Sequence, residues 1–335
     1  MKSSLSGLIL LIALILASSA GAQAPDAPPA PPSAAPQTPP KAASEEQATK
    51  IYDEQADAKA QIAQALAKAK KDNRRVLVQW GGNWCGWCRL LHGLYKSDKE
   101  IARKLLYEYE VVYVDAGKPA GKNIELAESY GADLKKHGFP YLTILDATGK
   151  AIANQETSSL EIKDKTAKPG HDPKLVLAFL TEHQAAYLDA QKVLDAGLQE
   201  ASQSSKRVFL HFGAPWCGWC HRLEDWLARE DVSSILSKDF IEVKIDTERM
   251  IGGQDLLTKY NVARTTGIPW FVILDGHGDN MIDSNGPSGK NIGYPGAGEE
   301  IEHFRSMLTA TAINLTPEDI RKLIGTLLEK PQAKP

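Results

Sequence analysis

The pentapeptide Trp-Cys-Gly-Trp-Cys occurs twice, at 84–88 and 216–220, and these two copies hold all four cysteines of the 335-residue chain. The likeness extends upstream, because KKDNRRVLVQWGGNWCGWC aligns without a gap with SQSSKRVFLHFGAPWCGWC. The interval between the copies is much longer than the roughly 20–50 residues of a solenoid repeat. Since a chain of this length fits about two domains, the repeat predicts a duplicated domain.

Both copies show the same order of predicted elements. An apolar run, 76–80 in the first copy and 208–212 in the second, precedes the cysteines and predicts a buried strand. Apolar residues at three- and four-residue spacing after the cysteines predict a helix. A second predicted strand ends in Asp115 or Asp246, a helical segment follows, and a proline then stands directly before a strongly apolar strand. The two copies therefore predict two domains of one architecture.

The start of the chain, 1–22, has the features of a secretory signal peptide. Lys2 supplies positive charge, the segment GLILLIALILA supplies an apolar core, and Ala20-Gly21-Ala22 is a small-residue cleavage site. The apolar run is shorter than the about 20 residues that span a membrane. We expect cleavage after Ala22 and export across the cytoplasmic membrane, to the periplasm or cell envelope in a bacterium. Retention of the signal as a membrane anchor is the alternative.

The other boundaries follow from composition and from the repeat. Residues 23–45 are nearly all Ala and Pro, which predicts an extended spacer. We place the two copies at 46–184 and 185–312, and a C-terminal helix and tail at 313–335. The polar segment 153–174 is expected to be a loop between the copies.

Charge and composition bear on the class of partner. The chain is 43% hydrophobic and 24% charged, as in ordinary globular proteins, and its formal net charge is −3. A basic run at Lys68–Lys71 lies at the end of a predicted helix, where cations suit the helix dipole. We therefore expect no nucleic-acid partner, because nucleic-acid-binding proteins present clustered basic surface.

The order of strand, Cys-x-x-Cys at a helix start, strand, helix, X-Pro and strand resembles a thioredoxin-fold domain in both copies. The resemblance, strengthened by Gly-Ile-Pro at 267–269, is greatest to periplasmic thioredoxin-like proteins and to the C-terminal domain of the bacterial transmembrane disulfide reductase. It implies an α/β fold class, with two tandem thioredoxin folds that each have a mixed central sheet and helices on both faces. It also implies redox-active disulfides Cys85–Cys88 and Cys217–Cys220, with no bound cofactor or metal. The implied partners are protein or peptide thiols and disulfides, with a membrane-embedded thiol protein as electron donor.

Thiol–disulfide exchange needs a thiolate that attacks and a second thiol that releases the mixed disulfide. The N–H groups and the dipole at a helix start favour an anion, which lowers the pKa of a cysteine placed there. Cys85 and Cys217 are therefore the predicted attacking thiols, which we expect to be accessible. Cys88 and Cys220, one turn further on, are the predicted resolving thiols and are expected to be more buried.

Aromatic and proline side chains close to the cysteines are predicted to bind substrate. Pro140 and Pro269 match the family's cis-proline, which leaves a backbone edge for an extended peptide. Exposed indoles are common at interfaces, so the four neighbouring tryptophans are further candidates, with local packing as the alternative. These are Trp84, Trp87, Trp216 and Trp219.

Both copies depart from the family six residues before the first cysteine, where thioredoxins bury an acidic residue that shuttles protons. Here the positions hold Gln79 and His211. Glutamine does not titrate, whereas histidine has a reference pKa near 6.5. His211 is therefore a candidate proton relay, with simple packing or hydrogen bonding as an equally weighted alternative.

These features predict an extracytoplasmic thiol–disulfide oxidoreductase, with reductase or isomerase activity favoured over dithiol oxidase activity. A shared zinc site is disfavoured because zinc-binding cysteine pairs normally lie within tens of residues of each other. Purely structural disulfides are disfavoured because a bridge across two residues constrains the unfolded chain little. The alternative from another class is a peptide-binding or chaperone-like module without redox turnover.

Overall fold

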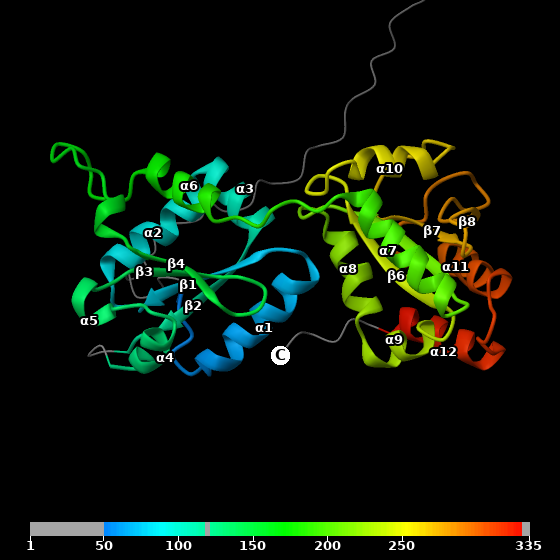
Figure 1. Ribbon diagram of the computed structural model, residues 1–335, viewed down its shortest axis with the longest axis horizontal. Helices are drawn as coiled ribbons and strands as arrows, with labels where there is room; N and C mark the ends of the chain where they lie inside the picture. Colours follow the sequence, from blue (N-terminus) through cyan, green and yellow to red (C-terminus); the bar gives the residue numbers. More distant parts are fainter. Residues whose placement is uncertain (1–49, 118–120, 330–335) are drawn as a thin grey trace, which may run out of the picture. The chain divides into compact units, whose positions relative to one another are not determined.

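The computed structural model describes residues 50–117 and 121–329 (Figure 1). The predicted signal peptide and Ala/Pro spacer lie outside the described residues. Two four-stranded sheets are present, with strand orders β2-β1-β3-β4 and β6-β5-β7-β8. β1 pairs in parallel with β2 and antiparallel with β3, and β5 pairs in the same way with β6 and β7. Both sheets are therefore mixed.

The first domain contains the first sheet and its helices. Its elements are α1 (Ala58–Lys71), β1 (Arg75–Gly81), α2 (Gly86–Ser97), α3 (Lys99–Glu108), β2 (Tyr109–Asp115), α4 (Ile124–Ser129), α5 (Leu134–His137), β3 (Tyr141–Leu145), β4 (Ala151–Glu156), the 3-10 helix η2 (Ser158–Leu160) and α6 (Pro173–Glu182).

Among the described residues, the second domain repeats this order without counterparts of α5 and η2, and adds α12. Its elements are α7 (Ala190–Gln203), β5 (Arg207–Gly213), α8 (Gly218–Leu227), α9 (Glu230–Leu236), β6 (Phe240–Asp246), α10 (Gly253–Tyr260), β7 (Trp270–Leu274), β8 (Asn280–Asp283), α11 (Gly298–Ala310) and α12 (Pro317–Leu328).

Alternation along the central strands builds a core on each face of each sheet. Successive side chains of a strand point to opposite faces. In β1, Val76, Val78 and Trp80 therefore pack with α1 and α4, whereas Leu77 packs with α2, α3 and α6. In β5, Phe209 likewise faces the helix that carries the cysteines. The predicted fold, with a mixed sheet covered by helices on both faces, is confirmed.

The segment 153–174 is not a loop between the domains, as we had expected. It begins in β4, continues through η2 and an isolated bridge between Glu161 and His171, and ends in α6. β4 is an edge strand in which Asn154 is exposed and Gln155 and Glu156 are half-buried, so polar side chains are accommodated there. The connection between the domains is the short stretch 183–189.

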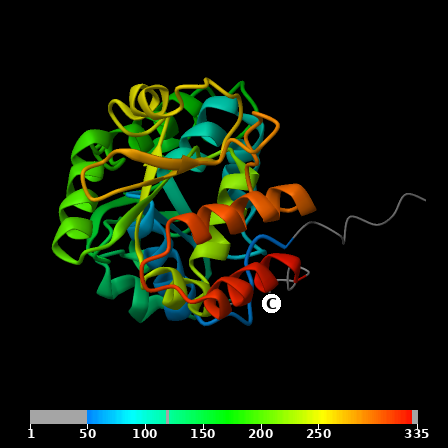
Figure 2. The same ribbon diagram turned by 90° about the vertical axis from the view of Figure 1, so that its right-hand side faces the viewer.

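The C-terminal helix α12 packs into the core of the second domain. Leu323, Ile324 and Leu327 join the same apolar cluster as Trp226 and residues of α11. The Trp226 indole also donates a hydrogen bond of 2.9 Å to the hydroxyl of Thr326. Figures 1 and 2 both show α11 and α12 as neighbours. Across the described residues, no helix combines the length and the apolar character needed to cross a bilayer.

The glycine that ends β1 is expected to be required by packing. A Cβ on Gly81 would lie 2.5 Å from the phenol oxygen of Tyr52 and 2.6 Å from the sulfur of Cys88. We predict that Gly81→Ala lowers the free energy of unfolding by about 1–3 kcal/mol, as overpacked cores do. Gly93→Ala is the matched control, because a Cβ there meets nothing within 4 Å and alanine favours the helix. Urea unfolding checks this, and equal stability of the two variants would contradict it.

Candidate active sites

Both cysteine pairs lie at a helix start, where an amide points at the first sulfur. Cys85 is the N-cap of α2 and Cys217 is the N-cap of α8. The backbone N–H groups of Cys88 and Cys220 each donate to the first sulfur of their pair, with N–S distances of 3.1 Å. The pairs form the disulfides Cys85–Cys88 and Cys217–Cys220. A hydrogen-bond donor aimed at a sulfur stabilises its thiolate, so the geometry favours ionisation of the first cysteine.

In each pair the first cysteine is the more exposed one, but only slightly. Cys85 and Cys217 are 6% and 4% exposed, against 0% and 2% for Cys88 and Cys220. The predicted order of exposure is therefore found, but the expected accessibility is not, because both attacking cysteines are buried in the disulfide apart from a narrow exposed edge. Close packing explains this, since residue 268 contacts the second pair and several aromatic rings surround the first.

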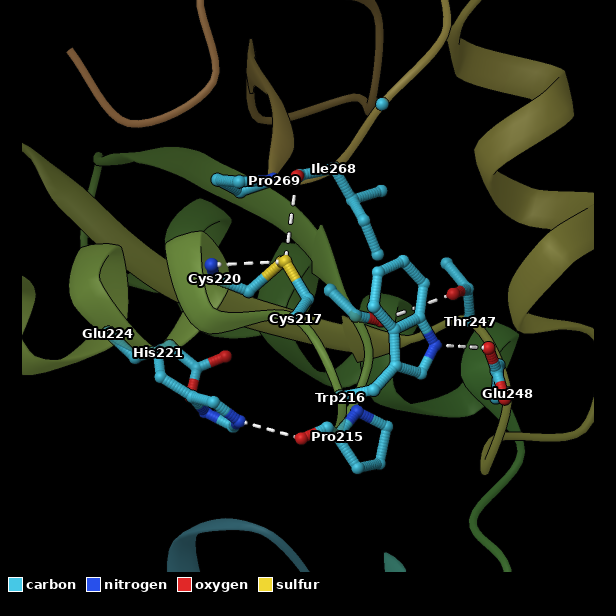
Figure 3. The surroundings of a disulfide bond; sticks show 12 residues. Pro215, Trp216, Cys217, Cys220, His221, Glu224, Thr247, Glu248, Ile268 and Pro269 are labelled. Atoms are coloured by element: carbon cyan, nitrogen blue, oxygen red, sulfur yellow. Dashed lines mark hydrogen bonds and ion pairs between the residues drawn. A yellow bond between two sulfur atoms is a disulfide. The ribbon is translucent and has the colours of Figure 1, made fainter. Parts of the chain in front are cut away.

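Both predicted cis prolines are cis. The bonds concerned are Phe139–Pro140 and Ile268–Pro269. The carbonyl oxygen of Ile268 lies 3.5 Å from the sulfur of Cys217 (Figure 3). A polar side chain holds the backbone next to each proline. Thr157 donates to the carbonyl of Pro140, and Asn291 donates to the carbonyl of Pro269. The proline strand therefore faces the second disulfide at contact distance.

The four tryptophans differ between the two centres. Trp216 and Trp219 are 56% and 58% exposed. Trp216 is fixed by a hydrogen bond of 2.5 Å from its indole N–H to Glu248 (Figure 3). Trp84 and Trp87 are only partly exposed. Their rings make edge contacts with Phe139 and with the buried His171, at centroid distances of 5.6 and 5.5 Å. Packing therefore accounts for part of the role of Trp84 and Trp87. Substrate contact stays a prediction for all four tryptophans.

Neutral groups stand behind the resolving cysteine of the first centre. The phenol oxygen of Tyr52 and the sulfur of Cys88 lie within 2.6 Å of the point that a Cβ of Gly81 would occupy. Gln79 is fully buried and donates to that phenol oxygen at 2.7 Å. Burial raises the pKa of Tyr52, so the phenol stays protonated at neutral pH. Asn83, two residues before Cys85, accepts the N–H of Tyr52 and so holds it there.

A charged network takes the corresponding place in the second centre. A Cβ on Gly213 would lie 3.4 Å from the sulfur of Cys220 and 3.5 Å from a carboxylate oxygen of Glu224. Glu224 pairs with Lys244 at 2.8 Å and with His221 at 3.5 Å. Burial raises the pKa of Glu224, but His221 and Lys244 outweigh it and lower the pKa to about 2. The Glu224 carboxylate is therefore ionised at neutral pH.

The candidate relay His211 is buried behind the second centre. Its Nε2 atom lies 3.1 Å from a carboxylate oxygen of Glu242 on the neighbouring strand β6. The structure thus gives His211 the hydrogen bond that we had weighed as the alternative, and proton transfer by His211 stays a prediction. No metal-binding group of three or more His, Cys, Asp or Glu side chains occurs in the part of the chain that the structure describes.

Two site residues were missed in the sequence. Glu224 follows Cys220 by four positions on a helix, so one turn places both side chains on the same face. That spacing was a usable signal. Tyr52 lies ahead of α1, far from the cysteines in sequence, and only its contact with the active-site loop reveals it. The position that matches Glu224 in the first centre holds His92, whose Nδ1 lies 3.1 Å from the hydroxyl of Tyr113.

We predict that Glu224→Gln makes the second centre more oxidising. The change removes a negative charge beside Cys220 and leaves Lys244 without this partner, so a thiolate at Cys220 becomes more favourable. We expect its reduction potential to become less negative by about 30 mV or more, equivalent to a tenfold change in the equilibrium constant. Equilibration in glutathione buffers, read by alkylation and mass, measures both centres. The first centre is the internal control, and an unchanged or more negative second potential would contradict the role of Glu224.

Family models match both domains. One described as a thioredoxin-like domain matches residues 62–160, and one described as thioredoxin-like matches residues 189–276. Among solved structures, a disulphide isomerase from Xylella fastidiosa Temecula1 is 27% identical, with a TM-score of 0.34. That match covers 39% of this chain and 95% of the other.

Curated relatives include protein disulfide-isomerases. Protein disulfide-isomerase erp38 of Neurospora crassa is 25% identical over 211 residues, which cover 60% of this chain and 51% of the relative. Protein disulfide-isomerase tigA of Aspergillus niger is 25% identical over 186 residues, covering 53% and 46%. The chain thus spans about half the length of these relatives. Together with the two sheets and their paired cysteines, the two family-model matches show that the chain belongs to the thioredoxin-like superfamily and carries two such domains in tandem.

Proposed function

We propose that the protein is a thiol–disulfide oxidoreductase that acts on protein or peptide disulfides through two dithiol centres. The observation that carries this proposal is the 3.1 Å hydrogen bond from the second cysteine's amide to the first sulfur, present in both domains. Such a donor favours the thiolate, the form of cysteine that attacks a disulfide. The cis-proline strand beside the second centre supplies the edge on which an extended peptide pairs.

The exchange reaction at the second centre proceeds in two balanced steps. The Cys217 thiolate attacks one sulfur of a substrate disulfide, the substrate S–S bond breaks, and a mixed disulfide forms as one substrate thiolate leaves and takes a proton. Cys220 then loses its proton and attacks Cys217, which releases the second substrate thiol and forms the Cys217–Cys220 disulfide. Two electrons pass from the enzyme to the substrate. An external dithiol reductant then returns the centre to the reduced state.

Reductase or isomerase activity is the favoured direction of this reaction. Relatives that carry the name protein disulfide-isomerase support exchange with protein disulfides. The Ile268–Pro269 sequence beside the second centre resembles that of reducing thioredoxins, which adds weight to reduction over oxidation. Disulfide oxidation is the minor alternative.

The site of action that we propose is outside the cytoplasm. The charged and apolar start of the chain, followed by a small-residue cleavage site, supports export. A reductase in an oxidising compartment needs a supply of electrons, for which we propose a membrane-embedded thiol protein as donor.

Loss of the attacking thiols is expected to abolish turnover. We predict that Cys85→Ala and Cys217→Ala each lower the rate of insulin reduction by dithiothreitol, and that the double variant falls to the rate of dithiothreitol alone. The physical reason is that the remaining thiols, Cys88 and Cys220, are buried and cannot reach a substrate disulfide. The turbidity of precipitating insulin chains measures the rate. A double variant with wild-type activity would instead indicate a peptide-binding or chaperone-like module without redox turnover.

A further inference from the structure

A groove of about 460 Å³ lies beside the second redox centre. One side of the groove is lined by the segment that contains cis Pro269, just before β7. The other side is lined by the loop that follows β8 and by the start of α11. The lining residues used below are Trp219, Arg222, Ile268, Tyr294 and Glu300. Since Ile268 also contacts the sulfur of Cys217, a peptide that presents a disulfide to Cys217 passes directly by this groove.

The Arg222 side chain places a cation over the aromatic wall of the groove. The rings of Trp219 and Tyr294 are stacked, with centroids 6.3 Å apart and planes inclined by 22°. The guanidinium carbon of Arg222 lies 4.6 Å from the Tyr294 ring centre and 5.4 Å from that of Trp219. These cation–π contacts hold the guanidinium at the rings without using a carboxylate. Between the described residues, none of the ion pairs or side-chain hydrogen bonds involves Arg222.

The acidic groups near the groove are engaged elsewhere. Glu300 lines the groove, but its carboxylate accepts the backbone N–H groups of Gly296 and Ala297 at 2.9 and 2.8 Å, at the start of α11. Asp225, three positions after Arg222 in α8, lines a different cavity together with His221. Arg222 is therefore the positive charge that the groove presents to a bound molecule.

The first centre lacks this feature although its cysteine motif is identical. The position that matches Arg222, two residues after the second cysteine, holds Leu90, which is 43% exposed. The ring that packs on Trp87 there belongs to His171 instead of a tyrosine. The matching position beside the first disulfide is therefore apolar, where that of the second carries a cation. The cation nearest the first cysteine pair, Arg89, instead donates to the carbonyl of Asn83.

The geometry points to a subsite in which Arg222 binds an acidic side chain close to the reacting cysteine of a substrate peptide. This inference rests on the proposed exchange function and names its substrate class for the second centre. A planar guanidinium held by two rings meets a carboxylate through two parallel hydrogen bonds, and little side-chain entropy remains to be lost. An aspartate or glutamate within a few residues of the substrate cysteine would supply that carboxylate, while the peptide backbone pairs with the proline strand.

The test compares two peptides that differ only in charge. Each peptide has one cysteine joined by a disulfide to a chromogenic thiol. The two residues before this cysteine and the two after it are all Asp in one peptide and all Asn in the other. Reduced Cys85→Ala protein reports the second centre alone. We expect it to react about tenfold faster with the Asp peptide at low salt, as one charge-assisted pair allows, and this preference to shrink as salt rises. We expect Arg222→Leu, which copies the residue of the first centre, to bring the ratio close to one.

The first centre, measured in Cys217→Ala protein, is the comparison and should show a smaller preference for the Asp peptide, because its nearest guanidinium, Arg89, is bonded to the carbonyl of Asn83. The same peptides with Ser in place of Cys measure binding without exchange, through the fluorescence of the exposed indoles. An Asp preference that survives Arg222→Leu, or equal rates in the wild-type second centre, overturns the subsite. A failure of both peptides to react while the Asp version still binds more tightly would remove the proposed exchange function and leave the subsite standing.

Discussion

The hydrogen bond from a helix-start amide to a cysteine sulfur is the interaction on which the two sites depend. It exists because each central strand ends in a glycine beside the cysteines, and the chain then turns directly into a helix capped by the first cysteine. The cap position brings the amide of the second cysteine within 3.1 Å of the first sulfur. The fold thus places one sulfur where an anion is favoured and buries its partner against the sheet. Substrate approach is then limited to the narrow exposed edge of the first cysteine beside the proline strand.

Identical motifs in this chain are backed by different chemistry. Behind Cys88 stand a protonated phenol and a buried amide, both neutral. Behind Cys220 stands a carboxylate that is paired with an ammonium and an imidazole. The groups that surround a thiol decide its pKa and its reduction potential. The duplicated domains therefore share a cysteine motif while their resolving thiols meet different electrostatic surroundings. The exposed surface beside each centre also differs, with Leu90 in the first and Arg222 in the second.

The fold could be predicted closely from the sequence, because the same local patterns occur in both copies of the repeat. Apolar runs and helix spacing specify the strands and the cysteine helices. The two cis bonds were expected only from the resemblance to thioredoxin folds. Tyr52 could not be predicted, since its contact with the active-site loop spans a long stretch of chain with no pattern of its own. The segment 153–174 was misread because an edge strand with one exposed face is as polar as a loop. Local sequence patterns do not specify contacts between distant parts of the chain or which face of a strand is exposed to solvent.

The most direct test of this account is the ionisation of the attacking thiols. The rate of alkylation by iodoacetamide is followed against pH for Cys85 in Cys88→Ala protein and for Cys217 in Cys220→Ala protein. Both substitutions keep the backbone amide that points at the sulfur. The account predicts inflections clearly below the pKa of about 8.5 for an ordinary cysteine. Inflections at or above that value in both centres would contradict it, because the helix start would then provide no stabilisation of the thiolate.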